Sequence, residues 1–160
     1  MRAILLGFGV LLSLVDHSLA DEQNQILGTW KLVSWVLQDV ATKEISYPYG
    51  QHPRGVLILT PSGRAMLMLT GEGRKIQPQT DEERSAAFRS LVAYSGQYRV
   101  EGDKWILKPD VAWNEGWIGT EQVRYFRREG DRLYIRTNPQ PMINFGNEIA
   151  VSTQIWEKEE

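Results

Sequence analysis

The sequence predicts an all-β protein whose single domain is a closed antiparallel barrel of eight to nine strands with one covering helix. Short runs rich in β-branched and aromatic residues recur along the chain, and turns containing glycine separate them. Only one segment, at Thr80, has the residues that start a helix. Barrel closure removes the exposed edges that such strands would present, whereas a parallel α/β fold would need more helices.

Residues 1–20 have the features of a signal peptide. Arg2 supplies a positive charge, residues 3–15 are almost wholly apolar, and Ser18 and Ala20 suit a signal peptidase. The apolar run is shorter than the roughly 20 residues of a membrane-spanning helix. We therefore expect residues 21–160 to form the barrel domain of an exported protein, periplasmic or secreted, without a stable membrane anchor.

The predicted first strand spans residues 28–38, and residues 42–47 are its predicted short partner. Two prolines and a glycine in residues 48–53 indicate a loop at the barrel rim. Residues 55–60 and 64–70 are predicted to pair as a hairpin, because the Pro-Ser-Gly sequence between them suits a tight turn.

The segment Thr80-Asp81-Glu82-Glu83 matches a capping box and predicts a helix that ends near Gly96. Ala87, Phe88, Leu91 and Tyr94 would then lie on one apolar stripe that covers part of the barrel. Glu-Gly-Asp turns separate two pairs of the strands that follow. These strands are predicted at residues 97–101, 104–108, 121–128, 132–137 and 148–156.

Composition argues against several classes of function. The formal net charge is −2, so the chain has no basic excess to attract nucleic acid. It has no cysteine, and only His52 remains after the predicted cleavage, so we expect neither a metal site nor a cofactor. A Gly-rich phosphate loop and a Gly-x-Ser-x-Gly motif are also absent from the sequence.

Four segments carry a family resemblance: GTWKLVSW at 28–35, YPYGQHPRGVLILTPSGRAM at 47–66, TDEERSAAF at 80–88 and WIGTEQVRYFRREGDRLYI at 117–135. Together they resemble the bacterial and fungal lipocalin-like domain family, over about residues 27–156. The resemblance implies a lipocalin-like barrel. It leaves two functions open, since such barrels include carriers of small apolar molecules and barrels that fold or cyclise a substrate.

The chain departs from the family pattern at three positions. Relatives often have histidines on the strand before the Trp117 motif and a proline two residues before that tryptophan, where this chain has Leu107, Lys108 and Glu115. If those histidines serve acid or base chemistry in relatives, their absence favours binding over catalysis.

Arg124 has two alternative roles in the predicted barrel. It can stack on Trp30 of the Gly-x-Trp motif at the closed end, as the resemblance implies. It can instead hold a ligand carboxylate or enolate inside the cavity, because a buried guanidinium needs an acceptor. Gln122 would share its strand face.

Two clusters of polar and aromatic residues are further candidates. In the rim loop, Tyr47, Tyr49, His52 and Arg54 could orient a polar ligand end or move a proton, or simply hydrogen-bond the loop. The second cluster contains Asp110, Trp113, Glu115 and Trp117. Its indoles could form flat apolar walls of a binding site and its carboxylates could act as acid or base groups, or the tryptophans could simply pack in the core.

Methionines supply the last candidates. Met66 and Met68 share one face of a predicted strand, and we expect this row to line the interior, as a pocket or as ordinary core. Met142, Ile143 and Phe145 lie in an irregular segment that could guard the barrel mouth.

The leading functional hypothesis is a protein that binds a small lipophilic or amphipathic ligand in its barrel. The ligand-binding residues would come from Tyr47, Tyr49, His52, Arg54, Met66, Met68, Trp113, Trp117, Gln122 and Arg124. One alternative is a cofactor-free isomerase or cyclase that uses Tyr49, His52, Asp110 or Glu115. Another is an envelope interaction module with a filled interior.

Overall fold

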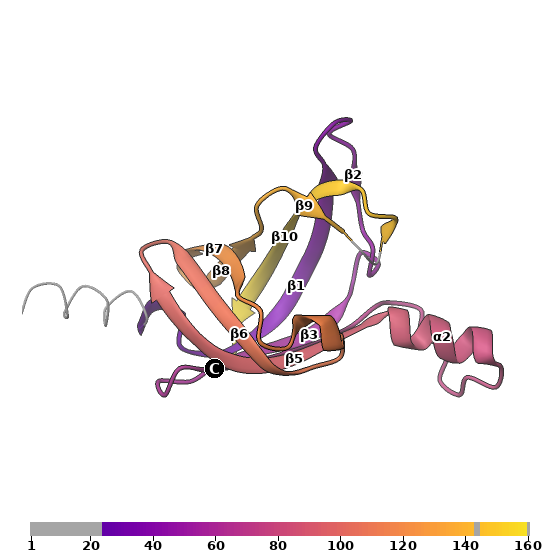
Figure 1. The fold of residues 1–160 in the computed structure, drawn as a ribbon, viewed down its shortest axis with the longest axis horizontal. Helices are drawn as coiled ribbons and strands as arrows, with labels where there is room; N and C mark the ends of the chain where they lie inside the picture. Colours follow the sequence, from indigo (N-terminus) through magenta and orange to yellow (C-terminus); the bar gives the residue numbers. More distant parts are fainter. Residues whose placement is uncertain (1–23, 143–144, 160) are drawn as a thin grey trace, which may run out of the picture.

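The computed structural model describes residues 24–142 and 145–159, which form a closed antiparallel β-barrel of eight strands with two short additional strands (Figure 1). Neighbouring strands follow the order β2-β1-β3-β4-β5-β6-β7-β8-β10-β9, and pairing of β1 with β10 closes the barrel. The strands are β1 (Gly28–Asp39), β2 (Ile45–Ser46), β3 (Arg54–Leu59), β4 (Arg64–Thr70), β5 (Leu91–Glu101), β6 (Lys104–Ala112), β7 (Gln122–Glu129), β8 (Arg132–Arg136), β9 (Gln140–Pro141) and β10 (Ile149–Lys158).

The all-β barrel class predicted from the sequence is confirmed, and so are the strands from which it was inferred. β1 and the β3–β4 hairpin occupy the predicted segments, with Gly63 at a φ of 77° in the turn. The two Glu-Gly-Asp turns place Gly102 and Gly130 at φ values of 62° and 58°, a region that favours glycine. The predicted signal peptide lies outside the described residues. No helix within the described part of the chain has the length and apolar character needed to cross a membrane.

The helix begins where the sequence predicts, but it ends earlier than predicted. The helix α2 (Asp81–Arg89) starts with the capping box, in which the Thr80 hydroxyl accepts from the backbone N–H of Glu83. It ends at Ser90, and β5 starts at Leu91, so the predicted continuation to Gly96 is wrong. The following residues pair with β4, and alternate side chains become buried in the barrel. Pairing of a whole strand therefore outweighs helical periodicity.

The position of α2 also differs from a covering helix. None of its residues is buried, and Figure 1 shows it projecting away from the barrel beyond the end of β5. Phe88 is 56% exposed and contacts Trp113, with ring centroids 5.8 Å apart. The helix is attached to the barrel by few contacts, so its stability depends mainly on its own local interactions.

Replacing Thr80 by alanine should therefore loosen α2 without unfolding the barrel. Loss of the N-cap hydroxyl costs roughly 1 kcal/mol of helix stability. Hydrogen exchange should accelerate about fivefold at the amides of α2, while exchange in β1 and the thermal unfolding midpoint stay unchanged. Ser85→Ala, which changes an exposed hydroxyl within the same helix, is the control. A large fall in the midpoint would show that α2 belongs to the cooperative core.

One end of the barrel is closed by the chain that leads into β1. Trp30 is fully buried, and its Nε1–H donates to the carbonyl of Ile26 at 2.8 Å. Two cations lie over its ring: Lys158 Nζ at 4.7 Å and the Arg128 guanidinium at 5.7 Å from the centroid. Each also donates to a carbonyl of the leading segment, Lys158 to Leu27 and Arg128 to Gln25.

This arrangement corrects the structural role considered for Arg124. The cations on Trp30 are Lys158 and Arg128, and Arg124 faces the cavity instead. Arg128 lies four residues after Arg124 on β7, on the same strand face. Period-two alternation could not decide which of the two arginines reaches the closed end.

A bulge bends the barrel between β5 and β6. The register shifts between Ser95 and Gly96, where Asp110 is the extra residue in β6 between Pro109 and Val111. Here the β6 backbone approaches β5 so closely that a Cβ on Gly96 would lie 2.2 Å from the Lys108 carbonyl oxygen. Glycine is therefore required by the contact between two backbones.

Candidate functional site

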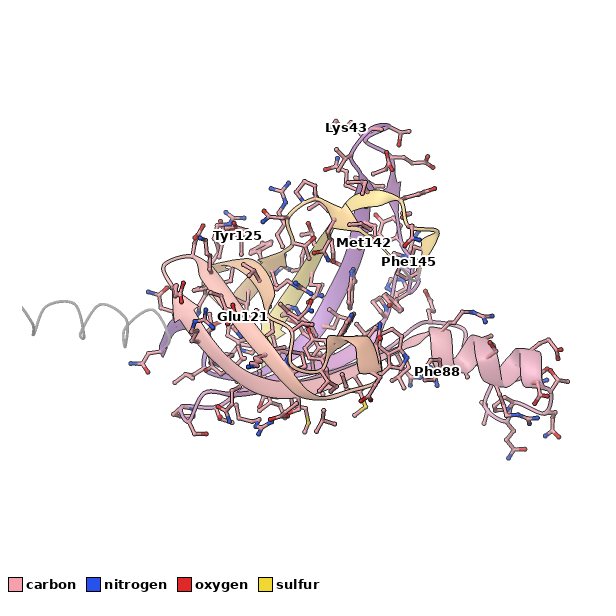
Figure 2. All side chains as sticks on the ribbon, in the orientation of Figure 1. Lys43, Phe88, Glu121, Tyr125, Met142 and Phe145 are labelled. Carbon is pink, nitrogen blue, oxygen red and sulfur yellow. The ribbon has the colours of Figure 1, made fainter. Side chains whose placement is uncertain are left out.

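The barrel contains a cavity of about 350 Å³ that opens at the end opposite Trp30. Its walls come from β1, the rim loop, β5, the segment 114–120, β7, β10 and the chain around β9. The lining residues are Trp35, Tyr49, Val92, Tyr94, Asn114, Gly116, Trp117, Thr120, Gln122, Arg124, Thr137, Gln140, Pro141, Met142, Phe145, Ser152 and Gln154. Figure 2 shows Met142 and Phe145 near β2 and β9, at the open end.

One side of the cavity is aromatic. Trp35 packs on Tyr49 with ring centroids 4.9 Å apart, and Tyr49 meets Phe145 edge-on at 5.6 Å. Tyr94 meets Trp117 edge-on at 5.6 Å. These rings give the cavity flat apolar surfaces suited to a planar or cyclic molecule.

The rim loop holds Tyr49 in this wall. Its residues cannot pair in a sheet, because Pro48 and Pro53 lack backbone N–H groups. The Glu72 carboxylate instead accepts from the backbone N–H groups of Gln51 at 3.0 Å and His52 at 3.3 Å, and the Glu72 N–H donates to the Tyr49 carbonyl at 2.8 Å. Tyr49 is only 3% exposed, so its ring contributes apolar surface to the cavity.

The other side of the cavity is polar and spans the neighbouring strands β7, β8 and β10. Alternation along β7 turns Gln122 and Arg124 inward, and alternation along β10 turns Ser152 and Gln154 inward. Thr137, just after β8, lies between them and accepts from the Ser152 N–H through its hydroxyl at 3.0 Å. Five polar side chains thus form a continuous strip inside the barrel.

Among the described residues that line the cavity, Arg124 is the only charged one. Its guanidinium donates to the Val123 carbonyl at 2.9 Å and to Gln122 Oε1 at 3.2 Å. Burial lowers its pKa from the ordinary arginine value, while the nearby Tyr94 acts weakly in the opposite direction. Burial also raises the pKa of the Tyr94 phenol, so that phenol stays neutral and supplies no counter-charge.

Several sequence-predicted site residues meet in this cavity. Tyr49, Trp117, Gln122 and Arg124 all line it. Tyr47 lies just outside, in a second cavity of about 220 Å³ that shares Met142 and Phe145 with the first. Ile143, predicted in the same mouth segment, lies outside the described residues.

Other predicted residues lie elsewhere. Met66 and Met68 are each 47% exposed on the outer face of β4, so the expectation that their row lines the interior is wrong. Leu67 and Leu69 occupy the interior instead. Both rows of side chains are apolar, so hydrophobicity alone could not show which row faces the barrel interior.

Three more predicted residues stand apart from the lining. His52 and Arg54 are exposed at the rim, His52 in the loop and Arg54 at the start of β3. Trp113 is half-buried behind the cavity, where it packs on Trp117 at 5.4 Å between ring centroids. It supports the aromatic wall from outside.

The proton-transfer groups considered for an enzyme are dispersed. Tyr49 lines the cavity, but Asp110 pairs with Arg64 on the outer surface at 2.7 Å, and Glu115 is exposed in the short 3-10 helix η1 (Glu115–Trp117). The Arg64 guanidinium lowers the pKa of the Asp110 carboxyl. In the described part of the chain, no three His, Asp or Glu side chains gather in a way that could hold a metal ion.

Sequence reasoning missed several of the lining residues. Trp35 lay in a correctly predicted strand, but its inward direction depends on a β-bulge between Leu32 and Ser34. Tyr94 was assigned to the helix. Ser152 and Gln154 lie between Ala150 and Trp156 on one face of β10, and two polar residues between apolar ones at period two were the signal that could have identified them.

Comparison with known proteins identifies the fold family. The family model described as a lipocalin-like domain matches residues 27–159, which is nearly the whole described part of the chain. A search of curated proteins gave no match. Barrels of this kind in general bind small hydrophobic ligands.

Proposed function

Because the chain belongs to the lipocalin-like domain family, we propose that it is an exported protein that binds a small amphipathic molecule in its barrel cavity. The observation that carries this proposal is the cavity of about 350 Å³, which is lined by aromatic rings and by a strip of polar side chains. Its volume is at the lower end of the range for small-molecule sites, roughly 300–1,000 Å³. The size favours a compact molecule over a long-chain lipid.

Affinity would come mainly from the aromatic side. Burial of apolar ligand surface contributes roughly 25 cal/mol per Å², and Trp35, Tyr49 and Trp117 provide the surface that covers it. The polar strip on β7, β8 and β10 would fix the ligand's orientation. Export is supported by the sequence of residues 1–20.

A pair of valine substitutions tests where binding takes place. Val92 lines the cavity and is 1% exposed, so Val92→Phe should fill part of it and weaken binding of lipophilic probes by about tenfold, equal to about 1.4 kcal/mol. Val111 is 65% exposed on the barrel surface, so Val111→Phe is the matched control and should leave binding unchanged.

Titration of the mature protein with a panel of lipophilic probes, followed by tryptophan fluorescence, provides the measurement. Trp35 and Trp117 line the cavity, so replacing both by phenylalanine should remove most of the fluorescence change that a bound probe causes. Failure of the wild-type protein to bind any probe, or equal loss in the two valine variants, would refute binding in the barrel.

A further inference from the structure

The cavity combines a half-buried positive charge, that of Arg124, with an absence of negative charge among the described residues that line it. No Asp or Glu is among them, and no ion pair joins Arg124 to any described carboxylate. A guanidinium has five N–H donors, and the carbonyl of Val123 and the amide oxygen of Gln122 engage only two of its nitrogens. A cation that is partly withdrawn from water and has no counter-charge is stabilised when a ligand supplies one.

Further donors around the cavity lack an acceptor. Ser152 is 3% exposed, and its hydroxyl has no hydrogen-bond partner among the described residues. The buried Nε1–H of Trp35 also has none. Both side chains line the cavity. Buried polar groups are normally paired, so two unpaired donors on residues that line one cavity favour a ligand that carries an acceptor.

The strand register places these donors on the strands that follow β7, the strand of Arg124, around the barrel. Tyr125 on β7 faces Arg136 on β8, so Arg124 lies beside Thr137, whose N–H donates to the Ser152 carbonyl at 3.0 Å. Trp35 on β1 is the register partner of Gln154 on β10. The Gln154 amide oxygen accepts from Trp156 Nε1 at 3.1 Å, which leaves its N–H groups as donors. Donors therefore outnumber free acceptors on this strip.

From these observations, and resting on the proposed function, we infer that the ligand is a compact organic monoanion with a carboxylate or enolate oxygen on Arg124 and a planar apolar body against the aromatic wall. Charge-assisted hydrogen bonds from a guanidinium to an oxyanion are short and strong. Tyr94 and Tyr49 stay neutral in this setting, because burial raises the pKa of each phenol. They form part of the apolar surface and do not compete for Arg124.

Three naphthalene derivatives test this inference by calorimetry on the mature protein at neutral pH. 2-Naphthoate, its methyl ester and 2-naphthylmethylamine share one aromatic body and differ in the charge of a single group. The wild-type protein should bind the anion about 10- to 100-fold more tightly than the ester, and the ammonium compound least tightly. Equal affinity for anion and ester would overturn the inference while leaving the proposed function intact.

Arg124→Met and Arg136→Met form a matched pair of variants. Arg136 lies beside the same strand layer but is exposed on the outer face of β8. Arg124→Met should bind anion and ester equally, whereas Arg136→Met should keep the wild-type preference. Because Arg124 carries an unpaired charge, its removal should leave the thermal midpoint unchanged or raise it. A lower midpoint with the anion preference retained would show that Arg124 is structural, which would refute the inference.

The test separates the two proposals. Binding of the probe panel without preference for the anion rejects the monoanion inference alone. Absence of binding by every probe and by all three naphthalene compounds rejects both. If Arg124→Met fails to fold, Arg124→Gln, which retains hydrogen-bond donors, should show the same loss of anion preference.

Discussion

Replacing Trp30 by alanine should destabilise the barrel by about 3–5 kcal/mol, with a fall of roughly 10–18 °C in the thermal midpoint. Trp30 is completely buried, and its indole packs in the core at the closed end of the barrel. The substitution leaves a large cavity that neighbouring strands cannot collapse to fill. It also removes the ring beneath Lys158 and Arg128, so both cations lose their cation–π contact.

Urea unfolding followed by circular dichroism gives the free energy of unfolding directly. Trp30→Phe is the informative comparison, because it keeps an aromatic ring but loses the N–H that donates to the Ile26 carbonyl. The phenylalanine variant should lose about 1–2 kcal/mol of the free energy of unfolding, which is less than the alanine variant loses. If the alanine variant loses less than about 1 kcal/mol, then the closed end contributes little to the cooperative stability of the barrel.

The strands of this barrel could be predicted because their local signals agree. The β3–β4 hairpin combines two apolar runs with a Pro-Ser-Gly turn, and Gly63 takes the positive φ that the turn needs. Two Glu-Gly-Asp turns mark the β5–β6 and β7–β8 connections in the same way. Where turn chemistry and hydrophobic pattern specify the same element, the sequence is sufficient to place it.

The two main errors occurred where local signals allow more than one structure. The capping box at Thr80 correctly starts α2, but nothing in the next residues marks its end, and the stripe through Leu91 and Tyr94 fits a helix as well as a strand. Pairing with β4 decides between them, and that contact is not local. The exposed Met66 and Met68 illustrate the same limit, because only the closed barrel defines which face is inside.

The candidate site was partly predictable for a related reason. Arg124, Gln122 and Trp117 stood out because charged, amide or indole groups in a predicted barrel require an explanation. Ser152 and Gln154 are common surface residues and attracted no attention until the β1–β10 pairing placed them inside. The cavity is built from strands distant in sequence, so its composition follows from topology.

Substitution of Gly96, which the sequence wrongly predicts to end a helix, should have the second large effect on stability. Its position suggested a helix end, yet it lies within β5 at the bulge opposite β6. An alanine Cβ would lie 2.2 Å from the Lys108 carbonyl oxygen and 2.7 Å from the Pro109 Cα. All these atoms belong to the backbone, so no side-chain rotation relieves the clash. Gly96→Ala should therefore cost about 3 kcal/mol.

Gly71→Ala provides the control for this substitution, since the nearest atom to its Cβ is the Ser90 side chain at 3.3 Å. That variant should lose less than about 1 kcal/mol in the same urea titration. If the free energy of unfolding of Gly96→Ala is within about 0.5 kcal/mol of the wild-type value, the β5 and β6 backbones can separate at low cost in free energy. A large loss would instead mean that this close approach fixes the curvature of the barrel. Because Tyr94 lies two residues before Gly96 and lines the cavity, the same contact then also sets the position of the aromatic wall.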